Sequence, residues 1–311
     1  MEVKNQSTSS DFILLGFSEG HVMLSVLIAL TYITILMGNF AIISIIRIDC
    51  HLQTPMYFFL SFLSILDIGY STVTLPAMFF NFVTNNRKIS FGMCFTQLYF
   101  FVYFGGSECL LLAAMAYDRY VAICNPLRYL VFMNKKFCSY LVLGCCSSGF
   151  MNSILHTSMS LQLNFCEDRN LNNFFCDVPP LLNIYCTNTQ KSYFLLYIVS
   201  VFLAITPFMC VTASYTRIIA TIFKIPSSAG RQKAFSTCSS HVIIVTIFYA
   251  TGFLNYIGPA PRGTFEFMIL SPLLYSFLTP LFNPVIYCFR NKEVKRAFNK
   301  LLSKYIFKGA L

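Results

Sequence analysis

Two carboxylic acids lie inside long, otherwise uncharged stretches of this chain, and they are the first residues from which chemistry can be argued. Asp67 is the only charged residue between positions 56 and 83. Glu108 is the only charged residue between positions 89 and 117. An ionisable group within an apolar segment is costly to bury and is therefore a functional candidate. The two groups could share a cation or a proton, or both could be protonated and form hydrogen bonds between helices.

Asp118-Arg119-Tyr120 follows directly after the second of these stretches. An arginine held by the neighbouring carboxylate could exchange between an internal partner and an incoming protein. An arginine at a membrane boundary can equally be an interfacial anchor whose charge reaches water. The tripeptide alone leaves both interpretations open.

The elements that carry these residues follow from the composition. Of the 311 residues, 56% are hydrophobic and 11% are charged, which is too apolar for a soluble domain of this length. A helix needs about 20 mostly apolar residues to cross a hydrocarbon core of ~30 Å. Seven runs meet this requirement: Val22–Ile46, Met56–Val83, Ile89–Tyr117, Phe137–Phe165, Tyr193–Thr216, Ala234–Ile257 and Phe267–Phe289. Helices satisfy the backbone hydrogen bonds of such runs in lipid, so the sequence predicts an all-α membrane protein with seven transmembrane helices.

Lys and Arg are divided unequally between the two sets of loops. Sixteen lie on one side of the membrane and six on the other. Cytoplasmic loops carry the excess of positive charge, so we expect residues 1–21 outside the plasma membrane, residues 22–289 in the bundle and residues 290–311 inside. The net charge of +10 then indicates topology and contact with anionic lipid headgroups rather than nucleic-acid binding. The same topology places the glycosylation pattern that begins at Asn5 outside the cell.

The thirteen cysteines divide by compartment. Four of them fall on the outer side, where disulfides form: Cys94, Cys166, Cys176 and Cys186. We expect two disulfides, and the spacing leaves the three possible pairings open. A zinc site is the alternative, although no pair of histidines lies nearby at ligand spacing. The cysteines within the spans and near the cytoplasm are expected to be reduced and to pack as small apolar side chains.

Two segments outside the seven runs have recognisable roles. The outer loop, residues 162–191, contains Pro179-Pro180 and cannot be a long helix, so with its disulfides it is expected to form a lid over the mouth of the bundle. After the seventh run, apolar residues recur at helical spacing among basic ones at Val294, Phe298, Leu301 and Tyr305. This pattern predicts a short amphipathic helix on the inner leaflet.

Several strings along the chain, in order, resemble the motifs of olfactory receptors. Pro55-Met56-Tyr57-Phe58-Phe59-Leu60, leading to Asp67, resembles the second-helix signature of that family. The string MAYDRYVAICNPLRY, from Met115 to Tyr129, is similar to the third-helix motif. KAFSTCSSH, from Lys233 to His241, resembles the sixth-helix motif, and PLFNPVIY, from Pro280 to Tyr287, resembles the seventh. Gly38-Asn39 resembles the first, so the resemblance spans the whole chain.

The resemblance implies a rhodopsin-like seven-helix bundle that signals through the stimulatory olfactory G protein to adenylyl cyclase. It implies that Arg119 engages the G protein, that Asp118 restrains Arg119, and that Asp67 and Glu108 form a sodium or proton site. It also implies the disulfides Cys94–Cys176 and Cys166–Cys186. The full set of residues implied for coupling and switching is Asp118, Arg119, Tyr120, Tyr215, His241 and Tyr287.

The resemblance further implies an odorant cradle beneath the second outer loop. Its predicted lining is uncharged and consists of Phe101, Val102, Gly105, Gly106, Val199, Leu203, Tyr249, Gly252, Phe253, Tyr256 and Ser276. A pocket of aromatic and apolar groups with a few hydroxyls suits a neutral volatile ligand, because a buried ligand charge would need a partner. Any of these residues could instead pack against another helix or face lipid. Asn173 stands where many family members have a histidine proposed as a metal ligand, so no metal or other cofactor is expected in odorant binding.

Three other classes of protein fit the sequence less well. A secondary transporter would show repeated halves and charged, broken helices, which the sequence lacks. An enzyme would need a nucleophile with its base or a metal motif, and none is present in the sequence. A rhodopsin-like receptor for a non-olfactory metabolite is the closest rival, and the sixth-helix string favours the olfactory class over it.

Overall fold

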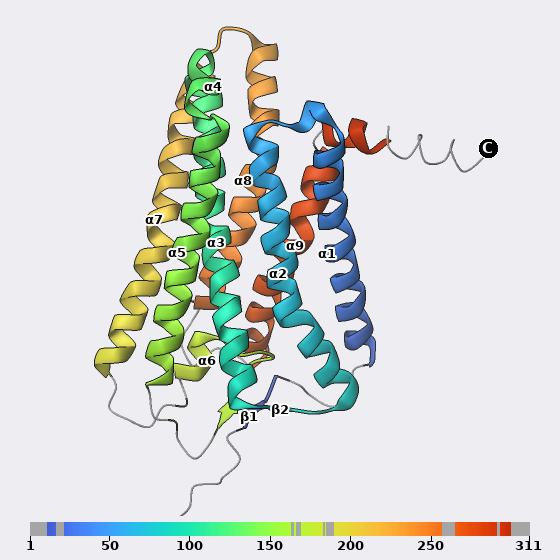
Figure 1. Cartoon of the computed structure of the whole chain (residues 1–311), viewed down its shortest axis with the longest axis vertical. Helices are drawn as coiled ribbons and strands as arrows, with labels where there is room; N and C mark the ends of the chain where they lie inside the picture. Colours follow the sequence, from blue (N-terminus) through green and yellow to red (C-terminus); the bar gives the residue numbers. More distant parts are fainter. Residues whose placement is uncertain are drawn as a thin grey trace, which may run out of the picture.

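The protein is a bundle of long helices that run side by side (Figure 1). The structure is a computed structural model that describes residues 11–16, 22–162, 165, 169–182, 184, 190–256, 265–290 and 293–299. Its seven long helices are α1 (Val22–Ile48), α2 (Pro55–Thr84), α3 (Phe91–Cys124), α5 (Lys135–Leu161), α7 (Gln190–Phe223), α8 (Ser228–Tyr256) and α9 (Phe265–Arg290). The prediction of a seven-helix fold is confirmed.

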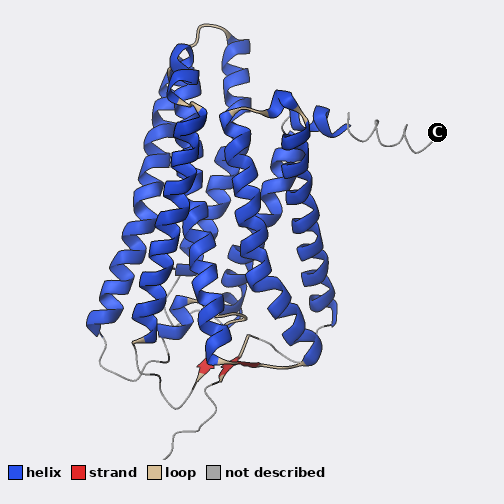
Figure 2. Cartoon of the chain, in the orientation of Figure 1, coloured by secondary structure: helices blue, strands red, loops and turns tan. Residues whose placement is uncertain are grey.

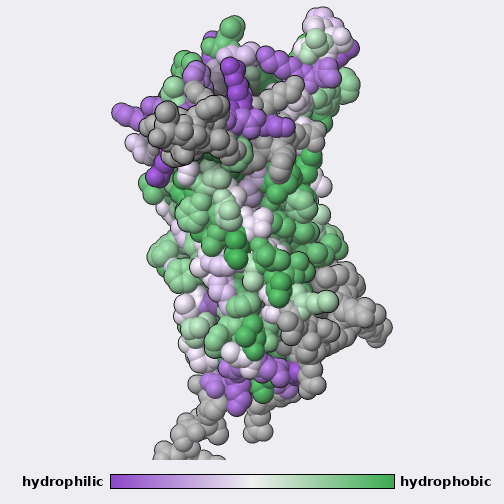
Figure 3. Space-filling model, turned by 90° about the vertical axis from the view of Figure 1, so that its right-hand side faces the viewer, coloured by the Kyte–Doolittle hydropathy of each residue, from purple (hydrophilic) through white to green (hydrophobic). Residues whose placement is uncertain are grey.

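The bundle has the surface of a membrane protein. Six of its helices are long and apolar enough to cross a membrane, and the described side chains of the seventh, α9, form an apolar helix from Leu273 to Tyr287. On the face shown in Figure 3, a hydrophobic band separates two hydrophilic ends. The chain is therefore a multi-pass membrane protein.

The helices extend beyond the uncharged runs from which they were predicted. The helix α7 continues past Arg217 to Phe223, and α8 begins at Ser228, ahead of Arg231 and Lys233. At 1.5 Å per residue, a 34-residue helix such as α7 is ~50 Å long, which exceeds the hydrocarbon thickness of ~30 Å. Charged residues are tolerated on the projecting turns because they reach water, so an uncharged run marks the membrane-embedded part of a helix rather than its ends.

Local sequence explains where several helices begin and end. The Ser90 hydroxyl accepts a hydrogen bond from the Met93 backbone N–H at 3.3 Å and caps α3. The Asn134 side chain accepts one from the Phe137 N–H at 2.9 Å and caps α5. Pro55 occupies the first turn of α2, where its missing N–H is not needed, and α2 ends at Asn85 in the left-handed conformation.

One end of the bundle carries a small sheet (Figure 2), and we call it the sheet end. The strand β1 (Phe12–Leu14) pairs antiparallel with β2 (Lys88–Ile89) and parallel with β3 (Asn170–Leu171), in the order β2-β1-β3. The sequence did not predict this sheet, because strands of two or three residues are too short to show an alternating pattern.

The predicted lid loop lies at the same end. A disulfide joins Cys94 at the start of α3 to Cys176 in the loop, which confirms that predicted pair. Beyond Cys176 the described part of the loop forms the five-residue helix α6 (Val178–Leu182), a short helix as expected from its two prolines. Cys166 and Cys186, predicted as a second pair, lie outside the described residues, as does Asn5.

The opposite end carries short helical turns and the last described helix. The connections contain η1 (Cys50–Leu52), η2 (Pro126–Arg128) and α4 (Tyr129–Phe132). Residues 293–299 are helical and turn away from the bundle axis (Figure 1). Val294 and Ala297 are buried against the bundle, whereas Phe298 is exposed. The helix expected after the seventh run is thus present at residues 293–299, its position on the inner leaflet stays a prediction, and Leu301 and Tyr305 lie outside the described residues.

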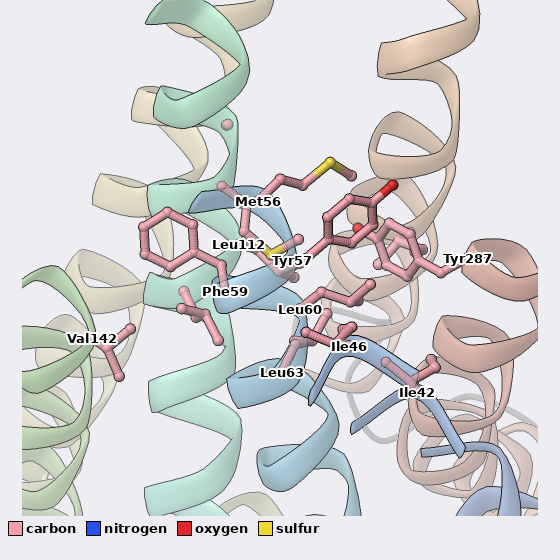
Figure 4. Packing of buried hydrophobic residues seen from close by; sticks show 14 of the residues in the cluster. Ile42, Ile46, Met56, Tyr57, Phe59, Leu60, Leu63, Leu112, Val142 and Tyr287 are labelled. Atoms are coloured by element: carbon pink, nitrogen blue, oxygen red, sulfur yellow. The ribbon is translucent and has the colours of Figure 1, made fainter. Parts of the chain in front are cut away.

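Apolar side chains from all seven long helices fill the half of the bundle near this end. Figure 4 shows Ile42 and Ile46 of α1 gathered with Leu60 and Leu63 of α2, and Tyr287 of α9 belongs to the same cluster. Glycines permit close helix contacts in the bundle. A methyl group at Gly38 would lie 2.8 Å from Pro284 of α9, so α1 and α9 meet there nearly backbone to backbone.

A second close contact yields a test of the packing. A methyl group at Gly149 of α5 would lie 3.0 Å from the Tyr103 carbonyl oxygen of α3, whereas one at Gly144 would meet nothing within 4 Å. We expect Gly149→Ala to destabilise the purified protein by about 1–3 kcal/mol, because backbone cannot move aside as a side chain can. Gly144→Ala should be neutral or slightly stabilising. Thermal unfolding followed with a thiol-reactive dye measures both, and equal midpoints would contradict this account of α3–α5 packing.

Candidate functional site

The two intramembrane carboxyls are buried in the middle of the bundle. Asp67 is 0% exposed and Glu108 is 1% exposed. The Asn283 side-chain amide of α9 donates to both Asp67 carboxylate oxygens, at 3.0 and 2.8 Å. Glu108 is close enough to Asp67 to interact electrostatically with it, and its Oε1 atom has no hydrogen-bond partner among the described residues. The expected proximity of the two acids is thus observed, and Asn283 is a partner that the sequence analysis missed.

Further oxygen atoms lie one helical turn from these groups. The Ser64 hydroxyl precedes Asp67 by three residues, and the Thr279 hydroxyl precedes Asn283 by four. Both hydroxyls, together with the side-chain oxygen of Asn283, are buried without a hydrogen-bond partner among the described residues. Carboxylate, amide and hydroxyl oxygens are the ligands that hard cations prefer. This donor set fits a small monovalent or divalent cation.

Arg119 is buried and paired near the end opposite the sheet. Its Nη2 and Nε atoms lie 2.7 and 3.1 Å from Asp118 Oδ2. The Tyr129 hydroxyl donates to the other oxygen, Asp118 Oδ1, at 2.7 Å. Partial burial, followed by the neighbouring Asp118 carboxylate, raises the pKa of the Tyr129 phenol, so Tyr129 stays protonated and remains a donor. Tyr129 is the last residue of the third-helix motif, and its role was not predicted from the sequence.

The other predicted switch residues gather around Arg119. The Tyr215 hydroxyl of α7 lies 2.6 Å from His241 Nδ1 of α8, and their rings stack with centroids 5.8 Å apart. Tyr215 and Tyr287 are both within electrostatic reach of Arg119. Tyr120 packs with Tyr215 against the apolar cluster of Ile218, Ile222 and Cys238. The structure therefore brings α3, α7, α8 and α9 together at one polar centre.

Aromatic rings fill the interior nearer the sheet end. The Phe101 ring is buried, with its centroid 4.9 Å from the ring of Tyr70, 4.9 Å from that of Phe175 and 6.1 Å from that of Tyr275. Two of the three glycines of the predicted cradle, Gly105 and Gly252, lie against Tyr275, since a methyl group at either would come 3.4 Å from it. We call Tyr70, Phe101, Phe175 and Tyr275 the aromatic cluster.

The lid loop is tied to the bundle directly above this cluster. The Cys176 backbone N–H donates to the Gln97 side chain of α3 at 2.9 Å. The buried carboxylate of Asp177 accepts from the Val178 N–H at 2.7 Å and from the Asn255 side chain of α8 at 3.2 Å. These contacts connect the disulfide-bonded loop to the helix that carries His241.

Asn173, where a histidine would be needed for metal binding, has a structural role. Its side chain accepts from the Phe174 N–H at 2.8 Å, and its carbonyl oxygen accepts from the Gly16 N–H at 3.3 Å. The residue therefore shapes the lid loop and holds the segment that follows β1.

The remaining predicted cradle residues differ in their burial and in the groups that they contact. Ser276 is buried, and its hydroxyl donates to the Leu273 carbonyl at 3.2 Å. Val102 packs against the apolar cluster near the sheet end, which includes Phe101 and Leu98. Tyr249 contacts Cys109 at 3.3 Å. The structure differs from the prediction at two positions: Phe253 is 60% exposed rather than enclosed, and Gly106 faces Asn152 of α5 rather than the interior. The side chains of Val199, Leu203 and Tyr256 lie outside those that the structure describes.

A group of potential metal ligands follows α1. One ligand atom each from Asp49, Cys50 and His51 lie within 4.8 Å of one another. Asp49 Oδ1 accepts from the His51 backbone N–H at 3.0 Å and lies 2.9 Å from the His51 ring nitrogen. The first of these contacts is the cap of η1, so a local structural role accounts for the arrangement.

Comparisons with known proteins agree with this geometry. A family model described as olfactory receptor matches residues 28–305. Human olfactory receptor 10A7 is 44% identical over 310 residues, covering 98% of each chain. Human olfactory receptor 10J1 is 45% identical over 301 residues, covering 96% of this chain and 93% of that protein. The chain belongs to the olfactory receptor family.

The fold of this olfactory receptor is that of rhodopsin. The crystal structure of squid rhodopsin matches it with a TM-score of 0.68, covering 91% of this chain and 85% of that one at 16% identity. The receptor is therefore a membrane-spanning signalling protein of the G-protein-coupled class and not an enzyme, and a ligand and a G protein are its partners. The resemblance found in the motifs and the rhodopsin-like fold predicted from it are both confirmed.

Proposed function

We propose that the receptor binds a small, neutral volatile molecule at the aromatic cluster and responds by activating a stimulatory G protein of the olfactory type, which raises cAMP. The observation that carries the coupling half is the buried Asp118–Arg119 pair held by Tyr129. An arginine kept from solvent by a single carboxylate at the end of a helix bundle is positioned to exchange that partner for an incoming protein.

The chemistry around the aromatic cluster supports a neutral ligand. The carboxylate of Asp177, which lies within electrostatic reach of Tyr275, is already paired with Asn255 and the Val178 N–H. A charged ligand buried there would require an unpaired opposite charge. The aromatic cluster, with its rings and tyrosine hydroxyls, instead suits an apolar molecule with a carbonyl or hydroxyl group. The rings of Phe101 and Tyr275 would repack to make room for this molecule.

Two independent features support the proposed orientation, with the sheet end outside the cell. Loops at the opposite end carry the excess of Lys and Arg. The Cys94–Cys176 disulfide lies at the sheet end, and disulfides persist in the oxidising extracellular compartment. With this orientation Asn5 is outside and available for glycosylation, and Arg119 lies at the cytoplasmic end, where the G protein binds. The Lys and Arg residues of the loops at that end then lie beside the anionic inner leaflet.

The proposed mechanism follows the contacts between the two centres. A ligand that displaces Tyr275 pushes against Gly252 and Asn255 of α8, the helix that also carries His241. A shift of α8 changes the Tyr215–His241 hydrogen bond, and Tyr215 lies within electrostatic reach of Arg119. Arg119 then leaves Asp118 for the G protein. Ligand binding stabilises this arrangement only to the extent that it favours the shifted α8.

We also propose that Asp67 and Glu108 hold a sodium ion or a proton in the resting receptor. The unpartnered oxygens of Glu108, Ser64, Thr279 and Asn283 support this proposal, because buried polar atoms normally have partners. An ion there would join α2, α3 and α9 and oppose their relative movement.

The coupling proposal is tested by cAMP in cells that express the receptor with the olfactory G protein, screened against neutral volatile molecules. We expect Arg119→Ala to reduce the response about tenfold or more, because a charge-assisted contact contributes about 1.5–3 kcal/mol. Arg128→Ala removes the same charge at an exposed position nearby and should leave the response intact.

Cell-surface amounts of the two variants are matched before comparison. An odorant response that survives in Arg119→Ala would contradict the proposed role of Arg119. If receptor that is verified at the cell surface responds only to non-volatile metabolites, the result would favour a rhodopsin-like receptor for a non-olfactory metabolite.

The sodium proposal is tested by thermal unfolding of purified receptor in Na⁺ or in choline at equal ionic strength. We expect Na⁺ to raise the midpoint by about 1–2 °C, the shift that ~1 kcal/mol of ligand binding gives a chain of 311 residues. Asp67→Asn should abolish the difference, and Asp49→Asn, the same change outside the site, should preserve it. An undiminished Na⁺ effect in Asp67→Asn would rule out this site.

A further inference from the structure

A groove of about 740 Å³ lies on the outside of the bundle between α5 and α7, which run side by side in Figure 1. Its volume falls within the range of ~300–1,000 Å³ that is usual for small-molecule sites. Its walls are Ser147, Ser148, Met151, Asn152 and Leu155 of α5, and Ile198 and Phe202 of α7. Among the predicted cradle residues whose side chains the structure describes, none lines this groove.

The groove opens toward the membrane. Met151 and Phe202 are 64% and 68% exposed, and Leu155 and Ile198 are exposed as well. These apolar side chains belong to helices that cross the bilayer. A molecule that enters the groove therefore comes from the hydrocarbon phase and meets mostly apolar walls.

One wall residue brings an unsatisfied polar group to this apolar surface. The side-chain oxygen of Asn152 is buried and has no hydrogen-bond partner among the described residues. Its amide lies against α3, where a methyl group at Gly106 would come 3.3 Å from Asn152 Nδ2. The Ser147 hydroxyl beside it already donates to the Leu143 carbonyl at 2.7 Å. An amide oxygen without a partner is unfavourable in apolar surroundings, so a bound molecule that pairs with Asn152 is favoured.

The depth of Asn152 selects the kind of molecule. The helix α5 has 27 residues, so Asn152 lies four residues, or ~6 Å, from its middle. Sterol hydroxyls and phospholipid headgroups stay at the membrane–water interface, roughly 15 Å from the centre of a ~30 Å core. A smaller molecule with one hydroxyl can move to this depth as a whole, and pairing with Asn152 replaces the hydrogen bonds that its hydroxyl loses on leaving the interface.

We propose that the groove between α5 and α7 binds a lipophilic alcohol, an apolar molecule with one hydroxyl, taken up from the bilayer. Its hydroxyl pairs with the Asn152 amide, and its hydrocarbon part lies against Met151, Leu155, Ile198 and Phe202. A hydroxyl both donates and accepts, so it complements the amide in either orientation. The bound molecule joins α5 to α7, the helix that carries Tyr215, and this site goes beyond the proposed odorant cradle.

The test is photolabelling of the purified full-length receptor in lipid nanodiscs with a diazirine-bearing octanol, and separately with the matching diazirine octane. We expect the octanol to label residues 147–155 and 198–202, and Asn152→Leu to reduce that labelling about fivefold, the effect of one hydrogen bond of ~1 kcal/mol. The octane should label these segments weakly and equally in both proteins.

Two further variants separate the groove from general effects. Ser148→Phe fills the groove and should remove octanol labelling, whereas Ser139→Phe, on an exposed face of the same helix outside the groove, should not. Each variant is used only if its thermal midpoint matches that of the unmodified receptor. Octanol labelling that is unchanged in Asn152→Leu, or that a membrane sterol displaces, would overturn the proposal. Labelling needs no G protein, so its failure is distinct from failure of the coupling proposal.

Discussion

The exclusion of water from the interior of the membrane is the constraint on which this structure depends. In hydrocarbon every buried polar group must find a partner in the protein or in a ligand. Asp67 finds the Asn283 amide, and Asp118 finds both Arg119 and the Tyr129 hydroxyl. These pairs join helices that are distant in sequence or hold a charge at a defined place. One side-chain oxygen each of Glu108 and Asn152 has no partner among the described residues, and these are the two places where we propose an ion and a small molecule.

The two ends of the bundle differ in how they are held. At the sheet end the Cys94–Cys176 disulfide, the three short strands and the Asp177–Asn255 hydrogen bond fix the lid loop over the aromatic cluster. At the opposite end α7 and α8 are joined by the hydrogen bond between Tyr215 and His241, beside the buried Arg119, and by packing of Cys238 against Ile218 and Ile222. A rigid ligand-binding end and a more weakly tied coupling end suit a receptor in which α8 moves and α3 does not.

The sequence predicted the architecture well because the length and apolarity of each helix are visible along the chain, without knowledge of its neighbours in space. The seven runs became seven helices, and the Cys94–Cys176 pair came from the family resemblance rather than from cysteine spacing. Helix rotation was not encoded in the same way, so Phe253 and Gly106 were assigned to the interior although one is exposed and the other faces α5. Asn283 and Tyr275 were missed because an amide or an aromatic ring in an apolar helix shows its role only beside its partner. The short sheet left no pattern to detect.

The central claim is that activation moves the start of α8 away from the end of α3 and releases Arg119. Spin labels introduced as non-natural amino acids at Leu127, which is 99% exposed, and at Ser228, the first residue of α8, report this separation directly. The account predicts that an activating odorant together with the G protein shifts the distance distribution to longer values, and that Arg119→Ala weakens the part of the shift that depends on the G protein. A distribution that stays unchanged while cAMP rises would contradict it.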